Sequence, residues 1–186
     1  MTKKFLIDNI YLKNRLNIGG INLIYPNAYF NKVEEITIEF LKKNKIKALI
    51  LDIDNTLIDY SQNMTKSVEK WAKDLKGQGV KLYIVSNSNK KKKVEKIAKI
   101  LDIPYVFFAK KPLKSGFKKA KNELKEKEEN IAVVGDQIFT DVIGGNRANM
   151  FTILVEPINE KDFWYTKWKR PIENRIKKKI REKQGE

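Results

Sequence analysis

The sequence contains no cysteine and no histidine. Without cysteine the chain can form neither a disulfide nor a thiol nucleophile, and without histidine it can form no serine–histidine triad and no zinc site of the usual kinds. We therefore expect no zinc, haem or nucleotide cofactor. Any catalysis has to use carboxylates, lysines and hydroxyls, together with a hard metal ion where a metal is needed.

Long apolar runs are also missing, and no signal-peptide pattern opens the chain, so we expect a cytoplasmic protein. Attachment to the inner face of the membrane stays open. The 186 residues are 41% hydrophobic, which is enough for the core of one domain with terminal extensions.

Positive charge dominates, with a formal net charge of +16. An excess of this size suggests an anionic partner such as an acidic membrane or nucleic acid. The basic residues are 34 lysines and only 5 arginines, so genome composition is an equally good explanation. Both interpretations stay open at this point.

Short apolar runs alternate with amphipathic stretches along the middle of the chain. This alternation predicts an α/β fold with a central parallel sheet and helices on both faces. The expected strands are 46–51, 80–85, 105–108, 131–134 and 151–155, and the expected helices are 65–76, 90–100, 115–126 and 140–147. We interpret the charge run at 90–93 as a solvated helix start.

The two ends of the chain differ from this middle part. Imperfect helical spacing predicts one further helix over 29–43. We therefore divide the chain into an N-terminal extension with its helix (1–44), a catalytic core (45–158) and a basic aromatic tail (159–186). Aromatic residues 163–165 and Trp168 beside lysines suit a membrane interface, whereas the isoleucine stripe of the same tail suits packing onto the domain.

The first expected strand runs directly into two carboxylates, in the stretch ALILDIDNTL. Asp52 and Asp54 are two positions apart, so in an extended chain they point to the same side. Two like charges this close need a cation between them. The pair therefore predicts a metal site at the end of this strand.

Polar side chains follow the other strands as well. In open α/β sheets, ligands bind at the carboxyl ends of the strands. Carboxylates there suit Mg²⁺, and lysine and hydroxyl groups suit phosphate oxygens. The candidate residues are Ser86, Asn87, Lys110 or Lys111, Asp136 and Asp141.

These motifs resemble those of the haloacid dehalogenase (HAD) superfamily. The sequence DIDNT at 52–56 is similar to its DxDx[TV] signature, Ser86 and Lys111 fit its second and third motifs, and residues 135–141 fit its GDxxxxD motif. The stretches LIYPNAYF and GDQIFTDVIGGNRANMFTILVEPI look like the YqeG-type phosphatases of subfamily IIIA, which are related to the mitochondrial phosphatidylglycerophosphate phosphatases.

The resemblance implies a Rossmann-like fold and a role for each site residue. Asp52 is the expected nucleophile, Asp54 the acid and base, and Lys111 the balancing charge, with Lys110 as its substitute. Phosphate contacts are expected from Thr56, Ser86 and Asn87. Mg²⁺ is expected to bind Asp52, Asp136 and the main-chain carbonyl of Asp54, supported by Asp141.

The gaps between the motifs hold no sizeable cap domain, so we expect an open site. The resemblance implies a phosphatase that converts phosphatidylglycerophosphate to phosphatidylglycerol, with an anionic phospholipid and the membrane surface as partners. The net charge favours an alternative, a phosphatase acting on nucleic acid ends or nucleotides. A third hypothesis is a non-catalytic basic binding protein that keeps the fold.

Overall fold

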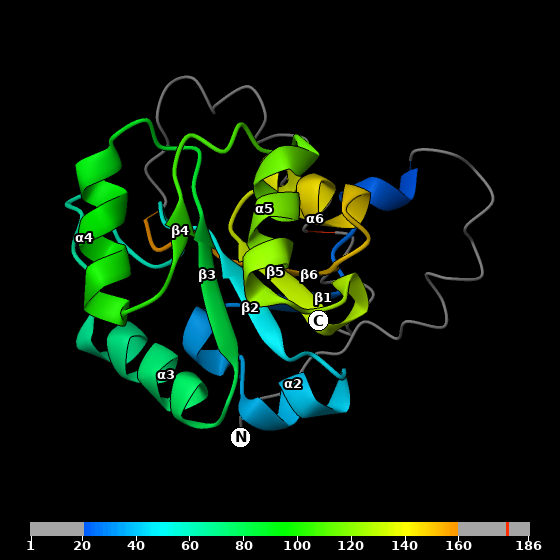
Figure 1. The fold of residues 1–186 in the computed structure, drawn as a ribbon, viewed down its shortest axis with the longest axis horizontal. Coiled ribbons are helices and arrows are strands. Elements are labelled where there is room, and N and C mark those ends of the chain that lie inside the picture. The colour runs from blue at the N-terminus through cyan, green and yellow to red at the C-terminus, as the bar shows by residue number, and fades with distance from the viewer. Residues whose placement is uncertain (1–20, 160–177, 179–186) are drawn as a thin grey trace.

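The structure is a computed structural model that describes residues 21–159 and Lys178. A six-stranded, fully parallel sheet lies at its centre, in the order β1-β6-β5-β2-β3-β4 (Figure 1). The strands are β1 (Ala28–Phe30), β2 (Ala48–Leu51), β3 (Lys81–Val85), β4 (Tyr105–Val106), β5 (Ile131–Gly135) and β6 (Phe151–Val155).

Helices cover both faces of this sheet. The α-helices are α2 (Ile38–Lys43), α3 (Lys66–Gly77), α4 (Lys91–Leu101), α5 (Lys114–Leu124) and α6 (Ile143–Arg147). Shorter turns are η1 (Ile21–Ile24), η2 (Val33–Glu35), η3 (Glu128–Asn130) and the π-helical η4 (Ile138–Val142). The α/β fold expected from the sequence is confirmed, and only residues 52–65 and 86–90 connect β2 and β3 to their helices, so neither connection holds a cap.

Strand β2 shows why its sequence reads as one apolar run. Leu49 and Leu51 belong to the core beneath α3 and α4, and Ala48 and Ile50 to the core beneath α5. All four are buried, because a central parallel strand is covered on both sides.

The expected helix over 29–43 is wrong in its first half. Residues 28–30 form the edge strand β1, in which Ala28 pairs with Ile153 of β6. The helix begins only after Thr37, whose hydroxyl accepts a hydrogen bond from the Phe40 amide and caps it. The apolar residues that suggested helical spacing are divided among β1, η2 and α2.

Two other boundaries also differ from expectation. Strand β4 ends at Val106, because the Phe108 amide donates to the Ser88 carbonyl and not to a neighbouring strand. The helix expected at 140–147 begins earlier, as η4, and becomes α-helical only at Ile143.

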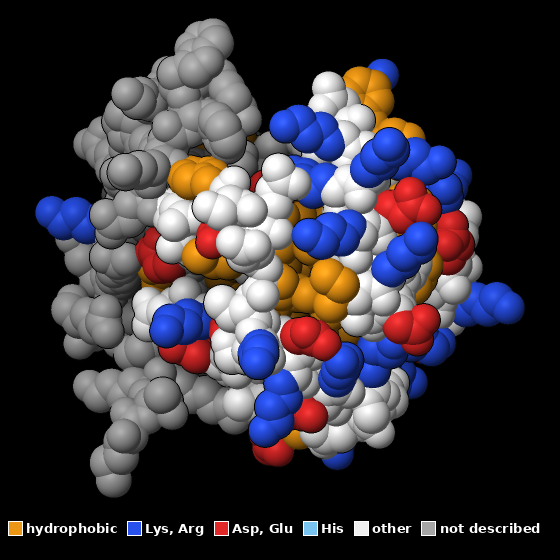
Figure 2. All heavy atoms as spheres, turned by 90° about the vertical axis from the view of Figure 1, so that its left-hand side faces the viewer, with side chains coloured by type: hydrophobic (Ala, Val, Ile, Leu, Met, Phe, Trp, Pro, Cys, Tyr) orange, Lys and Arg blue, Asp and Glu red, His pale blue; other side chains and the backbone are white. Residues whose placement is uncertain are grey.

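The division of the chain at residues 44 and 158 stays a prediction, although β1 places part of the expected N-terminal extension in the sheet. The tail aromatics at 163–168 lie outside the described residues. Among residues 21–159 and Lys178, no helix is long and apolar enough to cross a membrane. The side of the molecule with α3 and α4 displays many lysine side chains (Figure 2).

Candidate active site

The chain order of the sheet reverses at β2. From β2 the chain continues through β3 and β4 on one side, and then crosses to β5 and β6 on the other. Such a reversal leaves a crevice beyond the carboxyl ends of the two central strands. Asp52 follows β2 there, and Asp136 follows β5.

Three buried carboxylates meet in this crevice. Asp52, Asp136 and Asp141 each offer an oxygen, and these three oxygens lie within 4.8 Å of one another. The exposed fractions of the three residues are 8%, 1% and 2%. The sequence prediction that two strand ends join their carboxylates in space therefore agrees with the geometry.

The π-helical turn η4 brings Asp141 back toward the end of β5. The main-chain amides of Asp141 and Val142 both donate to the Gln137 carbonyl, and the Gln137 amide donates to the Asp141 carboxylate at 3.2 Å. A Cβ at Gly135 would overlap this carboxylate. Glycine at 135 therefore leaves the space that the third carboxylate occupies.

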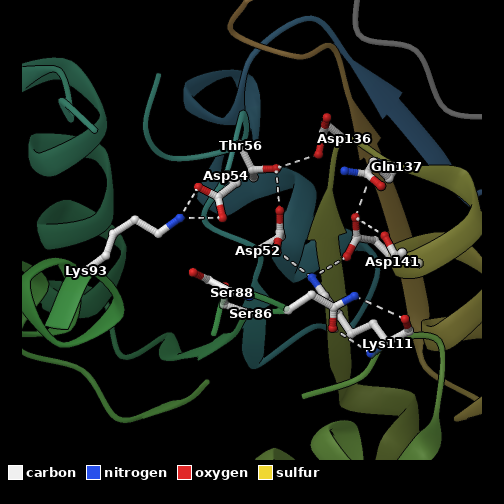
Figure 3. Close-up of polar contacts among 12 residues, drawn as sticks. Asp52, Asp54, Thr56, Ser86, Ser88, Lys93, Lys111, Asp136, Gln137 and Asp141 are labelled. Atoms are coloured by element: carbon white, nitrogen blue, oxygen red, sulfur yellow. Dashed lines mark hydrogen bonds and ion pairs between the residues drawn. The ribbon is translucent and has the colours of Figure 1, made fainter. Parts of the chain in front are cut away.

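Lys111 joins the carboxylates from the connection between β4 and α5 (Figure 3). Its Nζ donates to Asp52 at 2.5 Å and to Asp141 at 2.6 Å, and the residue is 7% exposed. The choice between the two adjacent lysines is thereby decided in favour of Lys111. Lys110 is exposed, and its Nζ lies 5.2 Å from the centre of the Phe108 ring.

The charges of this cluster do not balance by themselves. Burial raises the pKa of Asp52 to about 7. The positive charge of Lys111 lowers this pKa by less than burial raises it, and the negative charge of Asp141 raises it further. Burial alone would lower the pKa of Lys111, but Asp141 and Asp52 outweigh it and hold that pKa above its usual value.

Three carboxylates and one ammonium leave two negative charges in a buried site. The donor set is oxygen only, which a divalent hard cation prefers. The cluster of Asp52, Asp136 and Asp141 is therefore compatible with a divalent metal. Burial is the main cause that raises the pKa of Asp52, and the negative charge of Asp141 adds to it.

Two hydroxyl residues line the same site. The Thr56 hydroxyl lies 3.5 Å from carboxylate oxygens of both Asp52 and Asp136. Ser86 is fully buried at the end of β3, and its hydroxyl accepts from the Ser88 amide at 3.1 Å. Their roles in phosphate binding stay predictions.

Asn87 was expected to contact phosphate, but its side chain is engaged elsewhere. Its Oδ1 accepts from the Lys111 amide at 2.6 Å, and its Nδ2 donates to the Lys111 carbonyl at 3.1 Å. Both ends of the amide group thus hold the main chain of Lys111. The Asn87 side chain thus positions Lys111, and its expected contact with phosphate stays a prediction.

Asp54 does not join the carboxylate cluster. Its carboxylate binds the Nζ of Lys93 through both oxygens, at 2.5 and 2.7 Å (Figure 3). The Lys93 side chain is 12% exposed, so the interpretation of 90–93 as a purely solvated helix start is wrong for this residue. No feature of four consecutive lysines distinguishes Lys93; only the position of α4 across the crevice does.

The arrangement separates two chemical tasks. Asp52 lies deep beside a buried ammonium and a potential metal site, as a carboxylate nucleophile for phosphoryl transfer requires. The side chain of Asp54 is 45% exposed and lies nearer the opening, where a leaving group or a water molecule would arrive.

The chain is similar in sequence to a family of phosphatases and to one bacterial protein. A model of the family described as "Mitochondrial PGP phosphatase" matches residues 17–159. The "Probable phosphatase YqeG" of Bacillus subtilis (strain 168) is 36% identical over 159 residues, which are 85% of this chain and 92% of that protein.

One solved structure of low sequence identity shares the fold. A crystal structure of an uncharacterized protein from Listeria monocytogenes serotype 4b has a TM-score of 0.52 and 18% identity, over 63% of this chain and 85% of that chain. A putative HAD superfamily (subfamily III A) hydrolase from Legionella pneumophila has a TM-score of 0.41 and 28% identity, over 56% of this chain and 62% of that chain.

The sequence matches cover the strands that build the crevice and all the residues found in it. The resemblance inferred from the motifs is thereby confirmed. This chain belongs to the family of the mitochondrial PGP phosphatases, within the haloacid dehalogenase superfamily of phosphatases.

Proposed function

We propose that this protein is a Mg²⁺-dependent phosphatase that removes the terminal phosphate of phosphatidylglycerophosphate through a phosphorylated Asp52. The observation that carries the proposal is the buried Asp52 carboxylate, which shares Lys111 with Asp141 at the carboxyl edge of the sheet. The family supports the substrate.

The first half of the reaction transfers the phosphoryl group to the protein. A carboxylate oxygen of Asp52 attacks phosphorus in line, and the bond from phosphorus to the lipid oxygen breaks. The protonated Asp54 gives its proton to that oxygen, which leaves as the alcohol. Lys111 stabilises the negative charge that shifts onto the phosphoryl oxygens.

The second half returns the protein to its starting state. The Asp54 carboxylate takes a proton from a water molecule, and the oxygen of that water attacks phosphorus. The bond from phosphorus to Asp52 breaks, and inorganic phosphate leaves. Lys93 holds the Asp54 carboxylate by both oxygens and so fixes its direction toward the opening.

Asp52, Asp136 and the main-chain carbonyl of Asp54 would hold Mg²⁺, with Asp141 supporting the site. When bound, the ion supplies positive charge that stabilises the phosphoryl oxygens. Asp141 also accepts a hydrogen bond from the Lys111 ammonium, so it positions that group beside the nucleophile.

The open crevice favours a phosphate carried by a large molecule over one that a cap must enclose. The connections 52–65, 86–90 and 107–113 carry Asp54, Ser86 and Lys111, and none of them holds a cap domain. A lipid headgroup at a membrane surface fits this access. The net charge of +16 also fits a phosphorylated nucleic acid end, which is the second candidate.

The test is phosphate release with Mg²⁺ from vesicles that contain phosphatidylglycerophosphate, with a 5′-phosphorylated oligonucleotide assayed in parallel. We expect release from the lipid, and a loss of at least about 10³-fold in the Asp52→Asn variant. Release from the oligonucleotide alone would keep the mechanism and replace the substrate. Release from neither would overturn the proposed activity.

A further inference from the structure

Exposed apolar side chains gather at the active-site edge of the molecule. The large hydrophobic residues that are exposed in the described part of the chain are Ile100, Phe108, Leu113 and Ile158. Phe108 and Leu113 are 54% and 51% exposed and flank Lys111 in the connection between β4 and α5. Ile158 donates its amide to the Asn55 carbonyl, in the loop that follows Asp54.

The backbone at Phe108 has an unusual conformation for a residue with a bulky side chain. Its φ of 50° lies in the left-handed region, which bulky side chains rarely adopt. An exposed ring gains no burial that would offset this strain. The Phe108 amide is fixed to the Ser88 carbonyl at 2.9 Å, and Lys110 places its ammonium over the ring. Folding alone thus gives no reason for this arrangement.

Positive charge surrounds these apolar side chains. No acidic residue occurs between Asp102 and Glu123, and the first turns of α4 and α5 contain none. Helix N-termini favour acidic residues, so lysines at both of these N-termini oppose the helix dipole. The charge is therefore better explained by an anionic partner than by helix stability.

These features form one continuous surface. The Nζ of Lys91 lies 5.9 Å from the centre of the Phe107 ring, which joins the start of α4 to the connection before α5. Apolar and basic side chains lie beside one another at the upper edge of the view in Figure 2. We call this the rim surface, formed by Lys90, Lys91, Phe108, Lys110, Leu113 and Lys114.

We propose that the rim surface docks onto an anionic lipid bilayer, with Phe108 and Leu113 inserted at the headgroup boundary and the lysines against lipid phosphates. Apolar side chains ringed by ammonium groups match the two layers that such an interface presents. This docking would direct the Asp52 crevice at the membrane, and in that respect it rests on the proposed function.

The start of the C-terminal tail supports the same orientation. Asn159 accepts from the Tyr60 amide and donates its own amide to Asn55, so the described fold ends beside the loop that follows Asp54.

The test is flotation of the full chain with vesicles of phosphatidylcholine and phosphatidylglycerol. The variant Phe108→Asn/Leu113→Gln removes apolar surface without changing charge, and asparagine adopts the left-handed region more readily than phenylalanine. We expect at least about tenfold weaker partition for the double variant. The matched control is Ile100→Gln, in the last turn of α4 at the opposite edge, and it should bind as the wild type does.

Charge gives a second arm of the same experiment. Lys110→Gln/Lys114→Gln should weaken binding to the anionic vesicles and leave the weak binding to phosphatidylcholine vesicles as it is, because its effect is electrostatic. Equal binding of wild type and the Phe108→Asn/Leu113→Gln variant would overturn the docking proposal. The proposal would also be overturned if that variant lost binding to an oligonucleotide and kept its binding to vesicles.

Activity separates this proposal from the proposed function. In the Phe108→Asn/Leu113→Gln variant, the fall in phosphate release from lipid vesicles should exceed any fall on a soluble aryl phosphate. The wild type could hydrolyse both substrates, and the variant could bind and hydrolyse lipid vesicles as well as the wild type does. That outcome would overturn the docking proposal and leave the proposed function in place. If the wild type binds vesicles through the rim surface but releases no phosphate from either substrate, the proposed function is overturned and the docking proposal stands.

Discussion

Two neighbouring lysines at the active-site edge have opposite surroundings. Lys111 is buried between Asp52 and Asp141, whereas Lys110 is exposed beside Phe108. The sequence KK does not distinguish them, because either could face the crevice. The side chain of Asn87 makes the difference by fixing the main chain of Lys111 from the end of β3.

Lys93 is the residue of the site that the sequence did not reveal. Replacing it with glutamine removes the charge that holds the Asp54 carboxylate by both oxygens. We expect kcat on a soluble phosphomonoester to fall about tenfold or more, because a charge-assisted hydrogen bond at the acid and base is lost. KM should stay within about twofold, because Lys93 acts through Asp54 and not on bound phosphate.

The matched control for Lys93→Gln is Lys96→Gln, which removes an exposed charge farther along α4. Lys93→Arg should recover part of the lost kcat, since it keeps the charge. A rise in KM with unchanged kcat in Lys93→Gln would contradict a role through Asp54. It would place Lys93 on the substrate instead.

At the scale of elements, close approach between helices and the sheet positions the site. Gly144 and Gly145 of α6 lie against Phe117 of α5 and against Thr152 and Val133 of the sheet, where a Cβ would approach within 2.5–3.1 Å. This contact holds α6 directly after η4, the turn that carries Asp141. The sequence predicts a helix over 140–147 but does not predict how closely this helix packs against its neighbours.

Gly144→Ala tests that packing. The added methyl group would meet the Phe117 ring at 2.5 and 2.7 Å, so we expect a loss of about 1–3 kcal/mol in the free energy of unfolding. Denaturant unfolding would measure it. Gly77→Ala at the end of α3 is the control, because no atom lies within 4 Å of the added Cβ there, and it should be neutral or stabilising by up to about 1 kcal/mol. Equal stability of both variants would show that α6 moves aside freely.

At the scale of the whole molecule, the buried carboxylate cluster makes the stability of the fold depend on pH. The folded protein holds the Asp52 proton up to a pKa of about 7, whereas an unperturbed carboxyl releases it near 3.8. Without a divalent cation, the stabilising contribution of this group is complete below about pH 4 and is lost as the pH rises to about 7.

Thermal unfolding in a chelator, followed from pH 4 to pH 8, would measure this loss. The difference in Tm between wild type and Asp52→Asn should become less favourable to the wild type as the pH rises, since asparagine does not titrate. At pH 7.5, saturating Mg²⁺ should raise the Tm of the wild type more than that of the variant. A difference in Tm that stays constant between pH 4 and pH 7 without divalent cations would refute the assignment.

The sequence by itself determined the class of fold and the family. Strands and helices place apolar residues at different spacings, and this spacing is a local property of the sequence. When several strand and helix patterns alternate along the chain, tertiary contacts seldom change the type of these elements. Asp52 and Asp136 directly follow β2 and β5, so the geometry of a parallel sheet brings these two carboxylates to one edge. Their individual catalytic roles stay predictions.

Only the tertiary structure decided which side chains meet across the crevice. The pairing of Lys93 with Asp54, the contact of Asn87 with Lys111 and the place of residues 28–30 beside β6 all join segments far apart in the chain. The display of Phe108 depends likewise on its bond to Ser88. Such contacts depend on how the elements pack against one another, which no local period encodes.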